Sequence, residues 1–473
     1  MKKFTKILLI GCLLVTVSCN NWLDVDPKSQ VKDKDLFASE MGFKEALSGV
    51  YSLMTKEALY GKELTFGWLG VLGQEWTSVP YNYEDDQKYD FENAASEVRI
   101  DSVWTGLYNA IANANKLLKE LEGKENLFSG DNYFIIKGEV LALRAYLHFD
   151  LLRIFGASCT VGMERIAIPY VTEYAPTIFP QEKVGDFVGK VLKDLQDAAK
   201  CLENDPILTG RTVSEIDDNG YLMNRQVHLN YYAVKGLMAR VYLYKGDYAN
   251  AEVCAKEVIG SGCFEWVKQE NLTNESVADL TFSTEHLFAL NIVTLGNIVD
   301  KYLDGGNNSF ALEESRLSEY YGSSYDYRYL YLFKTGVGMS NTLRYLKKYD
   351  QLESVSWAQS YRNKLPLICL PEMYYILAEC RYHSSGDVLE PLNEVCRHRG
   401  VADLSEADLS AFETLLLAEY RKEVIGGGQL FFQYKRLNRS VVPGTDVDLA
   451  GEGRYVIPMP KEELENPGWV SNQ

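Results

Sequence analysis

The chain has 473 residues, of which 46% are apolar, 24% charged and 12% aromatic. A chain of this length and composition can bury a large core, which excludes disorder throughout and allows about three average domains or one large one. The 66 acidic residues outnumber the 48 basic residues, and the net charge of -18 argues against a nucleic-acid partner. Tyrosine is unusually frequent, with 32 copies beside 7 tryptophans, and surplus copies of these residues often lie at binding surfaces.

Residues 1–18 have the features of a lipoprotein signal peptide. A lysine-rich start precedes an apolar stretch, residues 7–17, that is too short to span a bilayer. Ser18 and Cys19 follow, a small residue and then the cysteine that a bacterial signal peptidase leaves first and acylated. Cys12 is a rival, but cleavage there would leave an apolar core of only a few residues. Because no later run of about 18 apolar residues occurs, we expect the lipid on Cys19 to be the only membrane attachment.

Seven cysteines remain after the signal peptide and Cys19 are set aside. Seven thiols cannot all pair, and no CxxC motif occurs, so buried small apolar residues are the simpler interpretation than a disulfide framework. They are Cys159, Cys201, Cys254, Cys263, Cys369, Cys380 and Cys396.

Helical periodicity dominates the rest of the sequence. The first predicted helices are 43–53, 104–121, 133–155 (ended by Gly156) and 184–202. Residues 229–259 then place Ala239, Tyr242, Gly246, Tyr248 and Ala251 at offsets 0, 3, 7, 9 and 12, which match the tetratricopeptide pattern of a closely packed antiparallel helix pair. Residues 373–400 fit the pattern more loosely. The sequence therefore predicts a mainly α-helical, tetratricopeptide-like repeat scaffold with irregular insertions and little β-structure.

Two irregular segments, residues 60–95 and 260–365, are rich in aromatic residues and are the predicted binding regions, since binding sites concentrate on loops held by a rigid scaffold. Carbohydrate recognition needs aromatic faces for the apolar side of sugar rings and planar amides for the hydroxyl groups. The candidate ligand-binding residues are Trp68, Trp76, Tyr81, Asn82, Tyr83, Tyr325 and Trp357, with Asn307 and Gln359 as further amides. Tyr327 is weaker, because it lies in the stretch Asp326-Tyr327-Arg328.

Catalytic and metal motifs are missing from the sequence. None of the five histidines belongs to an HExxH or HxH pair, and no GxSxG, P-loop or dinucleotide fingerprint occurs. The acidic pairs 85–86 and 313–314 could supply glycosidase carboxylates, but chance pairs are abundant in so acidic a chain. Residues 304–308, DGGNN, could help to hold Ca²⁺, although a solvated turn is the simpler interpretation. We therefore expect no catalytic residues, no metal and no cofactor.

Six stretches, in order along the mature chain, resemble the SusD/RagB outer-membrane lipoproteins of Bacteroidetes. They are CNNWLDVDPKSQVKDKDLF with EALSGVYSLM, WTGLYNAIANANKLL, GEVLALRAYLHFDLLRIFG with IPYV, AVKGLMARVYLYKGDYANAEVCAKEVI, LPLICLPEMYYILAEC with LNEVCRHRG, and RYVIPMPKEELENPGW. The resemblance implies about four tetratricopeptide-like helix pairs in one SusD-like domain, residues 19–473. It divides this domain into an N-terminal part of about 19–230 and a C-terminal part of about 231–473.

The resemblance also implies a function. It predicts a non-catalytic lipoprotein on the surface of the outer membrane that captures an oligosaccharide and passes it to a SusC-like TonB-dependent transporter in polysaccharide utilization. Capture of oligopeptides by the same architecture is the first alternative. A glycoside hydrolase, and a pure interaction scaffold without a small ligand, are two further alternatives. The sequence names neither the sugar nor its linkage and length.

Overall fold

The structure is a computed structural model that describes residues 34–209, 220–274, 277–306, 308–336, 342–351 and 361–472. Several predictions lie outside the described residues: the signal peptide, the lipidation site Cys19, and the candidate ligand-binding residues Asn307, Trp357 and Gln359.

The helices of the described residues run through most of the chain. They are α3 (Glu40–Met54), α4 (Trp68–Leu72), α5 (Glu84–Gln87), α6 (Ala94–Leu121), α7 (Asn132–Phe155), α8 (Val184–Cys201), α9 (Pro206–Thr209), α11 (Tyr231–Lys245), α12 (Tyr248–Ile259), α13 (Glu270–Thr273), α14 (Leu295–Tyr302), α15 (Glu314–Tyr321), α16 (Tyr327–Tyr331), α17 (Leu370–His383), α18 (Leu389–His398), α19 (Phe412–Glu423) and α20 (Leu430–Arg436). The strands are β1 (His286–Asn291), β2 (Leu312–Glu313), β3 (Phe333–Thr335), β4 (Leu343–Leu346) and β5 (Lys364–Cys369).

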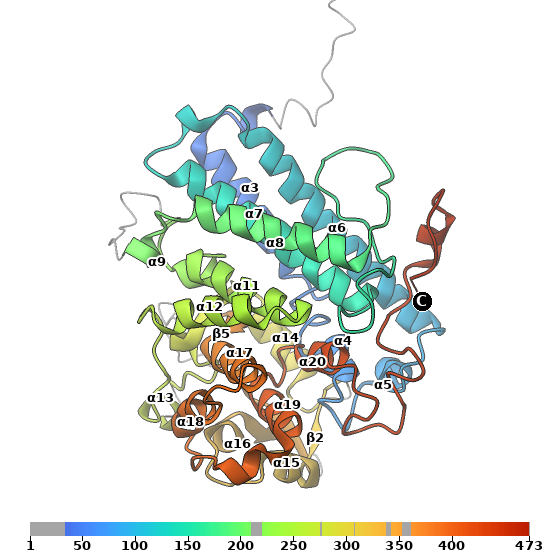
Figure 1. The fold of residues 1–473 in the computed structure, drawn as a ribbon, viewed down its shortest axis with the longest axis vertical. Coiled ribbons are helices and arrows are strands. Elements are labelled where there is room, and N and C mark those ends of the chain that lie inside the picture. Colours follow the sequence, from blue (N-terminus) through green and yellow to red (C-terminus); the bar gives the residue numbers. More distant parts are fainter. Residues whose placement is uncertain are drawn as a thin grey trace, which may run out of the picture.

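Eight of these helices form a continuous stack of four pairs. Each helix packs against the next in the order α3, α6, α7, α8, α11, α12, α17 and α18, and Figure 1 shows the stack running from the top of the molecule to its lower end. Neighbours in sequence pack as neighbours in space, which is the signature of a helical-repeat scaffold. The predicted mainly α-helical, tetratricopeptide-like fold is confirmed.

The pair α11 and α12 follows the tetratricopeptide pattern closely. The side chain of Asn230 caps α11 by accepting a hydrogen bond from the Ala233 amide. Gly246 ends the helix with a φ of 81°, in the left-handed region that glycine adopts without strain. Asp247 then caps α12 by accepting from the Asn250 amide. The turn between the two helices therefore has the residues that its geometry requires.

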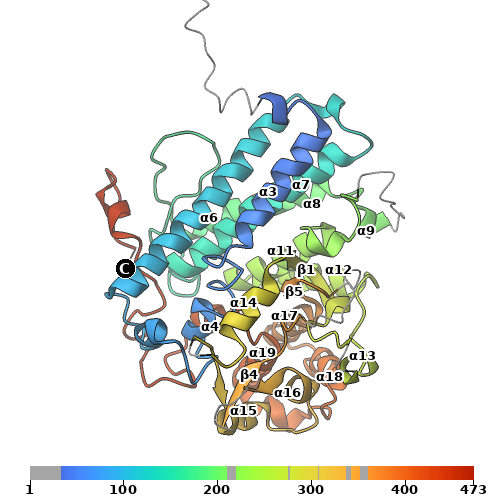
Figure 2. The same ribbon diagram turned by 180° about the vertical axis from the view of Figure 1, so that it is seen from behind.

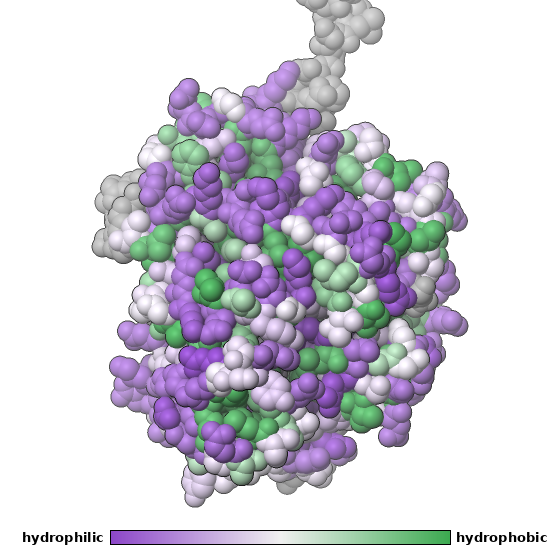
Figure 3. Space-filling view, in the orientation of Figure 1, coloured by the Kyte–Doolittle hydropathy of each residue, from purple (hydrophilic) through white to green (hydrophobic). Residues whose placement is uncertain are grey.

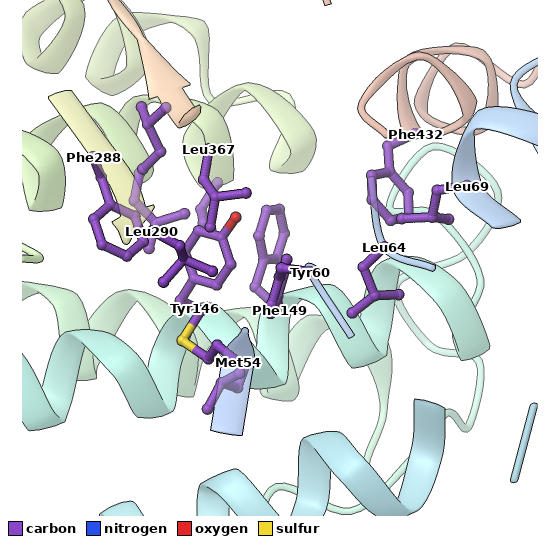
Figure 4. Close-up of a cluster of buried hydrophobic side chains, with 14 of the residues drawn as sticks. Met54, Tyr60, Leu64, Leu69, Tyr146, Phe149, Phe288, Leu290, Leu367 and Phe432 are labelled. Atoms are coloured by element: carbon purple, nitrogen blue, oxygen red, sulfur yellow. The ribbon is translucent and has the colours of Figure 1, made fainter. Parts of the chain in front are cut away.

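Helix α7 packs between α6 and α8 and is buried on almost every side. Figure 4 shows Tyr146 and Phe149 of this helix among side chains that come from distant parts of the chain. The other labelled members are Met54, Tyr60, Leu64, Leu69, Phe288, Leu290, Leu367 and Phe432. An all-round apolar helix is expected where one element contacts several layers. The core thus joins the N-terminal helices to the β1–β5 pair and to α20.

The segment between the repeat pairs is only partly irregular. Strands β1 and β5 pair antiparallel, with Leu290 opposite Leu365, and β2, β4 and β3 form a second antiparallel sheet in that order. Helix α6 begins ten residues before the predicted Trp104, because the Asn93 side chain accepts from the Ser96 amide and caps it at Ala94. That boundary prediction was wrong.

Buried ion pairs link the elements at the lower end of the molecule in Figure 1, around α16, α18 and α19. Arg328 donates to Asp326 at 2.7 Å and to Glu419 at 3.1 Å, so the Asp326-Tyr327-Arg328 stretch is structural. Arg399 lies between Glu285 and Glu423 and donates to both, at 2.5 and 2.7 Å. Each guanidinium is almost inaccessible to solvent, and its charge is balanced by at least two carboxylates.

The surface is polar with scattered apolar residues. Figure 3 shows hydrophilic residues over most of the face seen in Figure 1, with apolar residues in small separate groups. None of the helices in the described ranges is long and apolar enough to cross a bilayer.

Candidate functional site

Two loop segments meet on the side of the molecule where Figure 1 labels α4, α5, β2 and α15. Ser78 pairs with Ala311 in an isolated antiparallel bridge, and the Glu313 amide donates to the Thr77 hydroxyl at 2.6 Å. Residues 74–83 and 309–314 therefore share one wall, although more than 200 positions separate them in the sequence. We call this wall the loop surface.

Three of the predicted ligand-binding aromatics lie inside the loop surface and not on it. Trp68, Trp76 and Tyr83 are each at most 2% exposed. The Trp68 indole donates to Asp86 at 2.9 Å, and the Trp76 indole donates to the Phe66 carbonyl at 2.7 Å. Their rings are buried, and their polar atoms already make hydrogen bonds within the protein. These positions therefore argue against direct contact with a ligand.

Tyr83 and Trp76 instead form a buried layer beneath the loop surface, which we call the floor. Both rings pack on Phe310, at centroid distances of 5.1 and 5.9 Å. The Tyr83 hydroxyl donates to Glu63 at 2.8 Å, and the Arg99 guanidinium lies 3.9 Å from the centroid of the Tyr83 ring. The floor therefore fixes the backbone on either side of residues 81 and 82.

Tyr81 and Asn82 are exposed on this floor. The Tyr81 side chain is 86% exposed, which is extreme for so large a ring. Pro80 precedes it, and the buried Tyr83 follows it, while Arg99 donates to the Asn82 carbonyl at 3.0 Å. A short, anchored turn thus presents an aromatic face and an amide together, with little conformational entropy left to lose on binding.

Tyr325 is the other exposed candidate. Its side chain is 76% exposed, and its amide donates to the Ser323 hydroxyl at 3.2 Å. Asp326, the next residue, caps α16 and is held by Arg328, so the backbone beside Tyr325 is anchored.

The sequence analysis did not single out Tyr320, which contacts an arginine that supports the loop surface. Its half-buried ring lies 4.3 Å from the Arg421 guanidinium, which donates to the Gln74 carbonyl at 2.9 Å. The cation therefore joins α15 to the start of the loop surface. Tyr320 belongs to a tyrosine-rich stretch whose other members are mostly half-buried packing residues, and the sequence pattern did not single it out.

Two carboxyl groups beneath the loop surface have raised pKa values. Burial raises the pKa of Glu75 to about 7, while the Gly426 amide donates to it at 2.8 Å. Burial likewise raises the pKa of Asp86 to about 6, against the opposing charge of Arg99. Both groups are buried, so they support the backbone and do not reach a ligand from solvent.

A cleft of about 810 Å³ is lined by residues 88–101 and by residues near the C-terminus. One wall comes from Lys88, Asp90 and Ile100, which follow Tyr81 in the chain, and the other from Arg454 and Lys461 near the C-terminus. Its size and mixed lining suit a small ligand. Sequence reasoning could not find it, because its walls lie about 360 positions apart.

The histidine and the aspartate considered as functional candidates interact with other residues of the protein. His148 is buried, and burial lowers its pKa to about 3, while it accepts a hydrogen bond from the Val171 amide. Asp304, in the turn suggested for Ca²⁺, lies 2.8 Å from the Lys334 ammonium. Among the described residues no group of three or more histidine, cysteine, aspartate or glutamate side chains could hold a metal ion.

Comparison with known proteins defines the class of the fold. It is shared by a SusD superfamily protein from Bacteroides thetaiotaomicron, with a TM-score of 0.73 at 21% identity over 92% of this chain and all of that one. A SusD-like carbohydrate binding protein from Bacteroides vulgatus matches with a TM-score of 0.66 at 16% identity, over 85% of this chain and 84% of that one. A laminarin binding SusD-like protein matches with a TM-score of 0.63 at 18% identity, over 91% of this chain and all of that one.

The sequence comparison leads to the family. Residues 21–243 match the SusD-like family described as "Starch-binding associating with outer membrane". The SusD-like protein P38 of Formosa agariphila is 24% identical over 56% of this chain, and SusD-like protein P25 of the same organism is 24% identical over 33%. These matches span about half of P38 and a third of P25. The N-terminal half of the chain is therefore similar to the SusD-like family.

Proposed function

We propose that this protein is a non-catalytic, lipid-anchored binding protein of the outer-membrane surface that captures oligosaccharides at the loop surface. The observation that carries the proposal is the anchored turn that exposes 86% of Tyr81 beside the amide of Asn82. An exposed aromatic face with an adjacent planar amide matches the apolar face and the hydroxyl groups of a sugar ring. Tyr325 is proposed as a second contact for a longer chain of sugar units.

Similarity to the SusD-like family supports saccharide binding, since the family that residues 21–243 match is described as starch-binding. One of the structures that share the fold is named as laminarin binding. No residue of the loop surface is proposed as catalytic, and no cofactor is required.

The proposed context is nutrient uptake. Acylation of Cys19 would hold the single SusD-like domain, residues 19–473, at the membrane. The captured oligosaccharide would then pass to a SusC-like TonB-dependent transporter. Co-purification of such a barrel protein with the wild-type lipoprotein supports this step, and its absence from a purification made in gentle detergent counts against it.

The binding proposal is tested by isothermal titration against a panel of oligosaccharides, with laminarin fragments first and oligopeptides as a separate arm. Tyr81→Ala is expected to weaken the tightest glycan about 5- to 10-fold, the equivalent of about 1 to 1.4 kcal/mol for one lost aromatic contact. Tyr174→Ala is the matched control, because this tyrosine is likewise exposed, at 50%, but lies on the loop between α7 and α8. Equal effects of the two substitutions, or binding of peptides with no glycan bound, would contradict the proposal.

A further inference from the structure

A second cleft, of about 890 Å³, lies away from the loop surface. It opens where the end of α3 meets the start of α14 and the end of β1, and Figure 2 shows α3 and α14 on the same face of the molecule, one below the other. Nothing in the sequence pattern pointed to it, since its walls come from residues 48–57, 227–228 and 290–301. Its volume falls in the range of sites that take small ligands.

Several polar side chains of this cleft have no hydrogen-bond partner in the described part of the chain. They belong to different elements: Ser52 at the end of α3, Lys56 just after it, and Thr294 and Asn297 at the start of α14. Together they offer one ammonium, two hydroxyl groups and one amide. Such convergent groups on a concave surface are the usual means of orienting a small polar ligand.

His228 contributes an imidazole ring to the cleft, and a hydrogen bond to a buried carboxylate orients this ring. Its Nδ1 lies 2.9 Å from the buried carboxylate of Glu139, which also accepts from Arg225 at 2.7 Å and from the Tyr51 hydroxyl at 2.9 Å. Burial opposes ionisation of Glu139, but His228 and Arg225 outweigh it and lower the pKa of Glu139 to about 2. Because this carboxylate only accepts, Nδ1 carries a proton, and Nε2, which has no hydrogen-bond partner among the described residues, is left for a ligand.

The charge of the cleft differs from that of the molecule. The whole chain carries -18, but the charged side chains of this cleft are Lys56, Lys301 and Glu57. Lys301 lies 3.4 Å from Glu57, so Lys56 is the ammonium without a carboxylate partner among the described residues. Val293, which is 70% exposed, gives the same cleft an apolar edge.

We propose that this cleft binds a carboxylate-bearing sugar unit. Its carboxylate would lie against Lys56, its hydroxyl groups against Asn297, Ser52 and Nε2 of His228, and its C–H face against Val293. A neutral sugar would leave the ammonium unpaired, and a simple carboxylic acid would leave the hydroxyl-binding groups unused. The combination of one cation with several hydrogen-bonding groups therefore favours an acidic saccharide.

The cleft and the loop surface are separated by packed side chains. The Tyr302 hydroxyl donates to Glu57 at the cleft, while the Lys62 ammonium lies 4.7 Å from the Tyr302 ring and 5.7 Å from the Tyr83 ring. Lys62 and Tyr302 thus form a partition between the two regions. The two sites are expected to bind independently, so a failure of one leaves the other open to test.

The test compares D-glucuronate with D-glucose, which differ at C6, by saturation-transfer NMR titration of the full protein. Glucuronate is expected to bind more tightly than glucose, and Lys56→Gln is expected to remove that preference, a loss of about fivefold for one exposed charge pair. Asn297→Ala is expected to weaken both sugars. Lys200→Gln, which removes an exposed lysine from α8, is the matched control and should change neither affinity.

Three outcomes would overturn the proposal. They are the absence of saturable glucuronate binding, equal binding of glucuronate and glucose by the wild type, and a preference that survives Lys56→Gln. The Tyr81→Ala variant separates this site from the loop surface. It should retain the wild-type affinity for glucuronate while it loses affinity for the oligosaccharide, and loss of both would show that the two ligands share one site.

Discussion

Replacement of Arg399 by methionine tests the balance of buried charge that holds the lower half of the molecule. The Arg399 guanidinium is fully buried and makes four hydrogen bonds of 2.5 to 3.0 Å to the carboxylates of Glu285 and Glu423. Methionine fills much of the same volume but leaves both carboxylates without this cation. Removal of one partner from a buried ion pair costs about 3 to 5 kcal/mol of the free energy of unfolding.

The matched control lies two positions earlier. Arg397 also bonds a carboxylate, that of Asp403 at 2.8 Å, but its side chain is 54% exposed. Solvent screens this pair, so Arg397→Met is expected to leave the free energy of unfolding nearly unchanged. Urea unfolding of the wild type and both variants at pH 7, followed by circular dichroism, measures the difference directly.

The pH dependence gives the same experiment a second readout. Burial raises the pKa of both carboxyls. At Glu423 the charges of Arg399 and Arg328 outweigh burial and hold the pKa below the ordinary 4.5, whereas at Glu285 burial prevails. In the wild type, Glu423 therefore contributes stability above pH 4.5 and loses it as the pH falls further. Removal of Arg399 is expected to raise the pKa of both carboxyls, although Arg328 still donates to Glu423 at 3.0 Å. As the pH falls, these carboxyls should therefore be protonated in the variant before they are in the wild type.

The stability gap between wild type and Arg399→Met should accordingly narrow between pH 7 and pH 5. The reasoning is refuted if Arg399→Met is no less stable than Arg397→Met at pH 7. It is also refuted if the gap stays constant over this pH range, because uncompensated carboxylates would then not be its cause.

Three further predictions follow from individual side chains. Trp68→Ala should lower the free energy of unfolding by about 3 to 5 kcal/mol through its cavity and the lost bond to Asp86, yet leave glycan affinity of the folded protein unchanged, as urea unfolding and titration will measure. His148 should remain neutral down to pH 5 in ¹⁵N NMR spectra, because burial holds its pKa in the folded protein below the ordinary 6.5. The stability that the neutral ring contributes is therefore present above pH 6.5 and is lost as the pH falls below 6.5. Among the described cysteines only Cys263 is exposed, whereas Cys254, Cys380 and Cys396 are buried and the other three are half-buried. Native protein should therefore show one fast-reacting thiol with Ellman's reagent, and Cys263→Ser should abolish this phase; several fast-reacting thiols would contradict this prediction.

The helical scaffold could be predicted because its signals are local. The spacing of Ala239, Tyr242 and Gly246 reports helix packing and a turn within a few residues of one another. The same applies to α7, whose long apolar run ends at Gly156. Such patterns depend on the 3.6-residue period and on capping residues, which do not require knowledge of distant contacts.

The candidate site could be predicted only in part, because exposure within an irregular segment depends on distant packing. Trp76 and Tyr83 are buried by Phe310, a residue more than 200 positions away, whereas Tyr81 between them points to solvent. Nothing local distinguishes these rings. The cleft at Lys56 and Asn297 was missed for the same reason, since no single stretch of sequence contains both walls.

The most direct test of glycan capture at the loop surface is a crystal structure of the protein with the tightest-binding oligosaccharide of the panel. We expect an intact oligosaccharide with a sugar ring stacked on Tyr81 and a hydroxyl group bonded to Asn82. A ligand bound elsewhere with the Tyr81 ring still free, or a shortened product in place of the added oligosaccharide, would contradict this account.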